Sequence, residues 1–329
     1  MPNRIDPADD LRLELECEAR MPTQETPNYS LADQTIIFFD WDDTLFPTTQ
    51  LFDRWGLRAS ADYLCALSRE EEQDLQEWRD ALFDLLKKSC MLASKCIILT
   101  NSQRPWVQNC IDCFAPDLKQ LFDEYEGLET VYAKEYAPGK LHSARSMAPV
   151  LRKVASEEEF VVEQTFTKYV AMKSKVKEFY SRYAGQTWKN VLSFGDMPYE
   201  YHAMQDVTFH RVAPRWKQET VRTKCFMLPS GPSLSELALR LQFHEKVLVV
   251  YVHFDGDLRL DLTTEADPLD AIADAVGVPE LSPCFPHSPL SLTSPLSLHQ
   301  WGIGPKPQKM EIQHELATVE MIVSTIVSI

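Results

Sequence analysis

The chain has 329 residues, of which 44% are hydrophobic, so it is long enough to bury one large core or two modest ones. Its formal net charge of −16 argues against nucleic-acid binding, because affinity for phosphate backbones comes mainly from clustered Lys and Arg. The sequence contains no window of about twenty apolar residues and does not begin like a secretory signal. We therefore expect a soluble globular protein of the cytoplasm, with the nucleus left open, and no membrane contact.

The first strong element is a strand over residues 35–39 that runs directly into carboxylates. Its continuous β-branched and aromatic run is typical of a strand buried on both faces of a parallel sheet, where ligands bind at the carboxyl ends of strands. Asp40 and Asp42 follow the strand one residue apart, which places both side chains on one side of an extended turn. Two carboxylates in a small site require a cation, although an isolated pattern of this kind also fits a turn that caps the next helix.

A helix is expected to begin after Ser68, because Ser68 and Glu71 match the capping box that satisfies the first amides of a helix. Its apolar residues recur on one face, which predicts packing against the sheet. A second apolar strand over residues 96–100 ends at Thr100, again with a polar tip. The elements expected next are a helix after Pro105, a helix over 118–125 and a strand over 129–133.

The stretch of about 134–165 is predicted to be an irregular insertion over one edge of the domain, because it holds a Pro-Gly break and a run of three glutamates. A long helix follows over about 168–183. Most of its lysines are interpreted as a solvated face.

A third apolar strand over 191–195 ends in Gly195-Asp196, and Gly195 permits a close approach of the backbone. If Pro198 opens the next helix, Asp196 lies just before that helix and Glu200 lies in its first turn. The remaining segments are a predicted strand over 206–212 and residues 233–262, which finish the domain in an order that the sequence does not define.

Both ends of the chain differ in composition from the centre. Residues 1–30 are acidic with little apolar periodicity and are expected to form a mobile arm. The low-complexity Pro/Ser segment over 265–305 is predicted to be a linker. Residues 306–329 form a short apolar segment with heptad-like spacing, which favours a contact with the domain or with a partner.

The eight cysteines lack the paired spacing of a disulfide framework and are expected to be reduced thiols. Cys110 and Cys113 make a lone C-x-x-C pair. Zinc requires a second pair at similar spacing, so helix packing is the favoured interpretation of these two residues.

The ordered motifs resemble those of the haloacid dehalogenase-like superfamily of phosphohydrolases over about residues 34–212. The matching residues are, in chain order, Asp40-Trp41-Asp42-Asp43-Thr44, Thr100, Lys168 or Lys173, and Gly195-Asp196 with Glu200 four residues later. The resemblance implies a three-layer, Rossmann-like α/β domain over 31–264 with a central, mostly parallel sheet. Four ordered motifs are far more specific than any one of them.

The resemblance also implies a role for each motif residue. Asp40 would attack phosphorus to give an aspartyl-phosphate, and Asp42 would act as general acid and then as general base. Thr100 and the motif lysine would bind the phosphoryl oxygens. The implied cofactor is Mg²⁺, held by Asp40, the main-chain carbonyl of Asp42 and Asp196, with Glu200 nearby or bound through water.

The choice of lysine depends on where the helix begins. Lys173 has the more usual spacing before Asp196, but it lies more than a turn inside the helix expected from about residue 168. We therefore predict Lys168, at the expected amino end of the helix, as the motif lysine.

Both loops that carry caps in this superfamily are short here, so a small or absent cap and an open site are expected. An open site suits a phosphoprotein or another large phosphorylated substrate. The alternatives are a catalytically silent binding or regulatory module of the same fold, and a phosphotransferase that shares the first chemical step.

Overall fold

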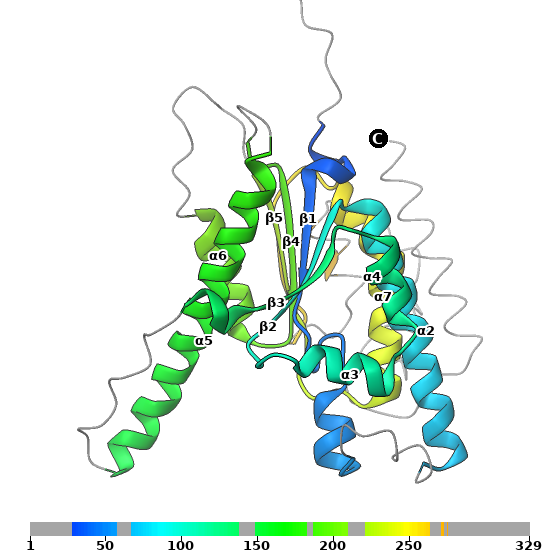
Figure 1. The fold of residues 1–329 in the computed structure, drawn as a ribbon. Coiled ribbons are helices and arrows are strands. Elements are labelled where there is room, and N and C mark those ends of the chain that lie inside the picture. The colour runs from blue at the N-terminus through cyan, green and yellow to red at the C-terminus, as the bar shows by residue number, and fades with distance from the viewer. Residues whose placement is uncertain are drawn as a thin grey trace, which may run out of the picture.

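The computed structural model of the protein describes residues 28–57, 67–137, 149–182, 187–209, 221–263, 271–272 and 275, and gives only the backbone for 28, 149–159 and 209. Six parallel strands form one sheet with helices on both faces (Figure 1). In chain order the strands are β1 (Thr35–Phe39), β2 (Lys95–Thr100), β3 (Leu128–Tyr132), β4 (Asn190–Gly195), β5 (Arg222–Met227) and β6 (Leu258–Asp261). This three-layer arrangement confirms the predicted Rossmann-like α/β class.

The described helices differ widely in length. The α-helices are α2 (Arg69–Leu92), α3 (Trp106–Phe114), α4 (Leu118–Glu124), α5 (Pro149–Tyr180), α6 (Pro198–Phe209) and α7 (Leu234–His253). The shorter helical turns are η1 (Asn28–Ser30), η2 (Ala32–Gln34), η3 (Thr49–Arg54) and η5 (Ala133–Tyr136).

The strand order β3-β2-β1-β4-β5-β6 places β1 and β4 side by side at the centre of the sheet. The chain proceeds from β1 to one edge and then returns to β4 and proceeds to the other edge. In open parallel sheets the crevice at such a reversal, at the carboxyl ends of the strands, is where ligands bind. The loops after β1 and β4 carry the predicted carboxylates to this place.

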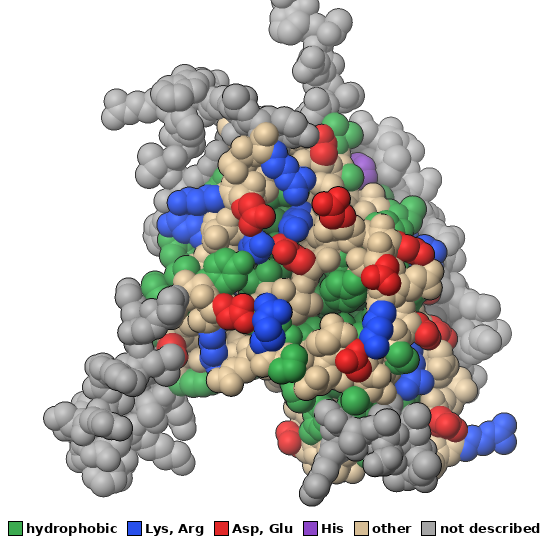
Figure 2. All heavy atoms as spheres, viewed as in Figure 1, with side chains coloured by type: hydrophobic (Ala, Val, Ile, Leu, Met, Phe, Trp, Pro, Cys, Tyr) green, Lys and Arg blue, Asp and Glu red, His purple; other side chains and the backbone are tan. Residues whose placement is uncertain are grey.

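A core lies on each face of the sheet. Ile37 and Phe39 of β1 pack with α2, α3, α4 and α7 on one face, and Ile36 and Phe38 pack with α5 and α6 on the other. Every residue of β1 is buried, as the continuous apolar run predicts for a central strand. On the face shown in Figure 2, acidic and basic side chains are interspersed.

The capping box predicted at the start of α2 is confirmed. The amide of Glu71 donates to Ser68 Oγ at 3.2 Å, and the amide of Ser68 donates to Glu71 Oε2 at 2.8 Å. Cys110 and Cys113 lie one turn apart on α3 and pack into or against the core. No group of metal-ligating side chains surrounds this pair in the described ranges.

Two predicted segments are wrong. The supposed insertion of about 134–165 is mostly helix, because α5 begins at Pro149 and runs without interruption to Tyr180. The three glutamates that suggested a loop are strong helix formers and lie within α5. The strand expected over 206–212 is incorrect over 206–209, since α6 continues to Phe209 and buries Ala203, Met204 and Val207 at helical spacing. Residues 210–212 lie outside the described residues.

The predicted arm, linker and carboxyl-terminal segment lie mostly outside the described residues. Tyr29, at the end of the predicted arm, donates a hydrogen bond to the carbonyl of His253 at 2.5 Å. Ile272, inside the predicted linker, is fully buried and belongs to the core beside α7, so packed structure extends at least that far. In the described parts of the chain, no helix combines the length and the apolar character needed to cross a membrane.

The Ile272→Ala variant is expected to lower the free energy of unfolding by about 2–5 kcal/mol, because it leaves a cavity in the core. Urea denaturation followed by circular dichroism measures this change. Met91→Ala is the control, since Met91 is exposed near the end of α2 and its loss should cost under about 0.5 kcal/mol. Equal unfolding midpoints for Ile272→Ala and the unaltered protein would show that Ile272 is dispensable.

Candidate active site

A hollow of about 350 Å³ lies at the carboxyl ends of β1, β2 and β4. Asp40, Asp42, Lys168 and Asp196 line it, so residues from three of the four motifs meet in one place. Thr100 and Glu200 are fully buried and lie beneath the residues that line the hollow, without lining it themselves. All six predicted site residues therefore lie in or directly beside one hollow.

Lys168 occupies the centre of the cluster. Its ammonium group contacts Asp40 Oδ1, donates to the carbonyl of Leu99 at 2.7 Å and lies 2.9 Å from Glu200 Oε1. Lys173 instead donates to the hydroxyl of Tyr169 and does not line the hollow. The structure thus brings Lys168, not Lys173, to the carboxylates.

The reason given for choosing Lys168 is nevertheless incorrect. Lys168 is not at the amino end of its helix, because α5 starts 19 positions earlier, at Pro149. A helix of 32 residues is about 48 Å long, whereas a strand of six residues spans about 20 Å. Figure 1 shows that α5 extends well past the edge of the sheet. A lysine 19 residues inside this helix therefore reaches Asp40 and the carbonyl of Leu99 at the strand ends.

Charge is unbalanced in this cluster. Asp40, Asp196 and Glu200 are all buried, and among the described residues Lys168 is the one ammonium group in contact with the cluster, through Asp40 and Glu200. Burial raises the pKa of Asp40 to about 6 against the opposing charge of Lys168. Burial, reinforced by the negative charges of Asp40 and Glu200, raises the pKa of Asp196 to about 9.

The same imbalance shifts the pKa values of Glu200 and Lys168. Burial raises the pKa of Glu200 to about 8, although Lys168 opposes this shift. Burial alone would lower the pKa of Lys168, but the charges of Asp40 and Glu200 outweigh it and raise that pKa. The lysine is therefore held as an ammonium ion, while the carboxylates compete for too little positive charge.

Gly195 makes room for Glu200. A Cβ atom at position 195 would lie 2.6 Å from both Cβ and Cγ of Glu200. These two atoms are close to the backbone of α6 and have little freedom to move. The absence of a side chain at the end of β4 thus lets the first turn of α6 bring Glu200 to Lys168.

Four donors hold the carboxylate of Asp42. Thr48 Oγ1 and Trp106 Nε1 donate to Oδ1 at 2.6 and 2.9 Å, and Ser102 Oγ and Thr100 Oγ1 donate to Oδ2 at 3.0 and 3.3 Å. The sequence analysis did not identify Thr48, Ser102 or Trp106 as site residues. The polar residues that directly follow the strand ending at Thr100 were the available signal for Ser102, whereas nothing local marks Trp106.

Asp43 braces the loop after β1. Its backbone adopts a left-handed conformation, with φ of 54°, which few residues other than Gly adopt easily. Its carboxylate accepts hydrogen bonds from the amide of Thr49 at 2.9 Å and from the hydroxyl of the same residue at 2.5 Å. Asp43 therefore fixes the turn that positions Asp40 and Asp42.

The described residues contain no three His, Cys, Asp or Glu side chains arranged as a complete metal site. The implied Mg²⁺ set needs fewer side chains, because a main-chain carbonyl and water complete it. Two observations fit such an ion: the shortage of positive charge around Asp40 and Asp196, and Glu200 Oε2, which is buried without a hydrogen bond from another described residue. The oxygen-only donors are those that Mg²⁺ prefers.

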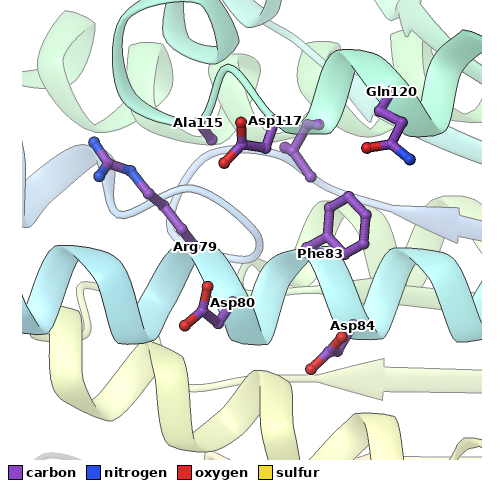
Figure 3. A pocket seen from close by; sticks show the side chains of 8 residues that line it. Arg79, Asp80, Phe83, Asp84, Ala115, Asp117 and Gln120 are labelled. Atoms are coloured by element: carbon purple, nitrogen blue, oxygen red, sulfur yellow. The ribbon is translucent and has the colours of Figure 1, made fainter.

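A larger hollow, of about 500 Å³, lies between α2 and the turn before α4 (Figure 3). Arg79, Phe83 and Asp84 come from α2, and Asp117 and Gln120 face them from the other side. Arg79 donates to the carbonyl of Phe114 at 2.5 Å, which ties the two elements together. None of the residues that line this hollow is buried and charged, so we place the site at the smaller one.

Comparison of the chain with protein-family models, curated proteins and solved structures finds no match. The functional interpretation therefore depends on the geometry above and on the motif resemblance.

Gly195→Ala is expected to displace Glu200 from Lys168 and to destabilise the protein by about 1–3 kcal/mol, because the new methyl group overlaps Glu200. The midpoint of urea denaturation should fall, and so should hydrolysis of a phosphate ester, the activity proposed below. Gly56→Ala is the matched control: its φ of 65° strains an alanine by about 1–2 kcal/mol, but no atom lies within 4 Å of the added methyl group. Turnover lost equally in both variants would mean that Gly195 acts only through stability.

Proposed function

We propose that this protein is a magnesium-dependent phosphohydrolase of the haloacid dehalogenase-like type, working through an aspartyl-phosphate. The observation that carries the proposal is the pairing of Asp40 with a buried lysine directly beside Asp42, which four donors hold at a separate position. Two adjacent carboxylates in different environments are suited to different roles, one as nucleophile and one as acid and base.

In the first step Asp40 attacks phosphorus. Lys168 holds Oδ1 of Asp40, so Oδ2 is the attacking atom. The new bond joins this oxygen to phosphorus as the bond from phosphorus to the leaving oxygen breaks. Asp42 donates a proton to that oxygen, and the alcohol departs.

The hydrogen bonds of Asp42 indicate which oxygen carries the proton. The indole nitrogen of Trp106 can only donate, so Oδ1 always faces a donor. The hydroxyls of Thr100 and Ser102 can rotate and accept, so a proton is accommodated on Oδ2. Trp106 thereby orients the acid proton without touching the substrate.

In the second step Asp42 removes a proton from water. The resulting hydroxide attacks phosphorus, the bond between phosphorus and Asp40 breaks, and inorganic phosphate leaves. Both residues return to their starting states. Lys168 offsets the charge of Asp40 when that carboxylate is restored.

A bound Mg²⁺ would be held by Asp40, the main-chain carbonyl of Asp42 and Asp196, with Glu200 through water, and would neutralise charge. The need is large: two like charges about 4 Å apart repel by about 4 kcal/mol at an effective dielectric constant of 20. Lys168 alone offsets one of the negative charges of the cluster.

The described residues support an open site. After β1 the described chain forms the short helix η3 and then α2, which packs on the sheet, and after β3 it forms η5 and α5. None of these four elements is a separate cap domain. We therefore infer a small or absent cap and a large phosphorylated substrate.

The direct test is hydrolysis of p-nitrophenyl phosphate with Mg²⁺. Asp40→Asn should lower kcat at least about a thousand-fold, because it removes the nucleophile and keeps its shape. Lys173→Met serves as control and should keep near-normal turnover, since Lys173 lies outside the cluster. Full activity of Asp40→Asn would exclude the covalent route, and an inactive unaltered protein that binds Mg²⁺ would favour the silent module.

Trp106→Phe should lower kcat about 10–100-fold on an alkyl phosphate and much less on p-nitrophenyl phosphate, whose leaving group departs without a proton. Trp78→Phe is the control, because Trp78 donates to the carbonyl of Leu45 at 2.9 Å and not to Asp42. Steady-state kinetics on both substrates give the ratio. A Trp106→Phe variant that slows both substrates equally would make Trp106 purely structural.

A further inference from the structure

The amino-terminal half of α5 projects beyond the sheet (Figure 1). Phe160 and Gln164 of this half line the hollow. Among the residues of α5 whose side chains are described, Ala171, Met172, Val176 and Phe179 in the later part of the helix are buried and pack on the sheet. Further out, Phe160, Val161 and Val162 are 56%, 40% and 68% exposed. Three consecutive exposed apolar residues next to a catalytic hollow favour a contact with something outside the chain.

One stripe of α5 connects this projection to the site. Phe160, Gln164 and Lys168 are four residues apart, so they lie on one side of the helix, and all three line the hollow. The stripe begins at the buried ammonium group and ends at an exposed aromatic ring. A substrate whose phosphoryl group reaches Lys168 therefore has Phe160 within reach of the groups attached to that phosphate.

Lys134 supplies a second contact. It comes from η5, is half-buried and lines the same hollow, and no described residue forms an ion pair or hydrogen bond with it. The roles proposed for the catalytic residues do not require this lysine. A half-buried ammonium group without a partner in an acidic hollow suits an anionic group of the substrate.

We infer that the substrate is a phosphorylated polypeptide, with an apolar side chain that packs on Phe160 and an acidic side chain that pairs with Lys134. The inference rests on the proposed function. Consecutive helical residues point about 100° apart, so Phe160, Val161 and Val162 cover about 200° of the circumference of α5. The two valines do not line the hollow. A ligand confined to the hollow contacts Phe160 alone, whereas a chain that crosses α5 covers the valines too.

The test compares O-phosphoserine with phosphoserine peptides that carry one Leu and one Glu at varied positions around the phosphoresidue. Both substrates contain the same phosphoester, so their kcat/KM ratio isolates the contribution of the peptide. Phe160→Ala and Lys134→Met should each lower the ratio of peptide to O-phosphoserine by about ten-fold, and Val162→Ser by a smaller factor. Met91→Ala is the control, because it also truncates an exposed apolar side chain but lies on α2, and it should leave the ratio unaltered.

Binding measured without turnover separates the two proposals. Fluorescence anisotropy of labelled phosphopeptide on the Asp40→Asn protein should show weaker binding when Phe160→Ala or Lys134→Met is added. Peptide binding that depends on Phe160 without any hydrolysis would retain the docking surface and overturn the phosphatase. Hydrolysis with an unchanged ratio of peptide to O-phosphoserine in all variants would overturn the proposed peptide contacts. A ratio changed by Phe160→Ala but not by Val162→Ser would identify a small-molecule substrate instead.

Discussion

A single ammonium group, that of Lys168, is placed where the protein most needs positive charge. It is buried between Asp40 and Glu200 and also binds the carbonyl at the end of β2. Three different elements thus converge on one nitrogen atom. Burying this many charges costs free energy that the ion pairs only partly return, so the arrangement favours function over stability.

Aromatic packing holds the other half of the site. Trp41 and Phe46 stack with ring centroids 5.3 Å apart, and Phe46 meets Trp78 and Trp106 edge to face. These rings fasten the acidic loop to α2 and α3. Because Trp106 also donates to Asp42, the packed rings and the hydrogen bonds of the site share the same residue. The position of Asp42 is therefore determined by the core beneath it.

In the proposed function, the shape of α5 links the cluster around Lys168 to the choice of substrate. The helix packs on the sheet with one half and extends past it with the other, so a single rigid element carries both the buried lysine and the exposed apolar residues. A site that forms at the base of such a projection is accessible to extended chains. Under the proposed function, selectivity would reside in the residues that line the site rather than in a separate cap.

Part of this structure could be predicted from the sequence, because it depends on interactions between residues that are close together in the chain. The continuous apolar run before Asp40, the capping box at Ser68 and the Gly-Asp pair after β4 depend on neighbouring residues alone, and each element forms as expected. Because parallel strands bring their carboxyl ends to one edge, the carboxylates of the first and fourth motifs could be expected to meet.

Other features were decided only by tertiary contacts. The glutamates in the supposed insertion carry no signal that separates an exposed loop from an exposed helix, so the true start of α5 was missed. The choice between Lys168 and Lys173 depends on how far α5 extends past the sheet, and the donors to Asp42 come from chain positions up to 64 residues away. Sequence alone determined the strands and their acidic tips through short-range propensity and burial. Only the folded structure decided that Lys168 reaches Asp40 and that Trp106 reaches Asp42, because both contacts depend on how elements distant in the chain pack together.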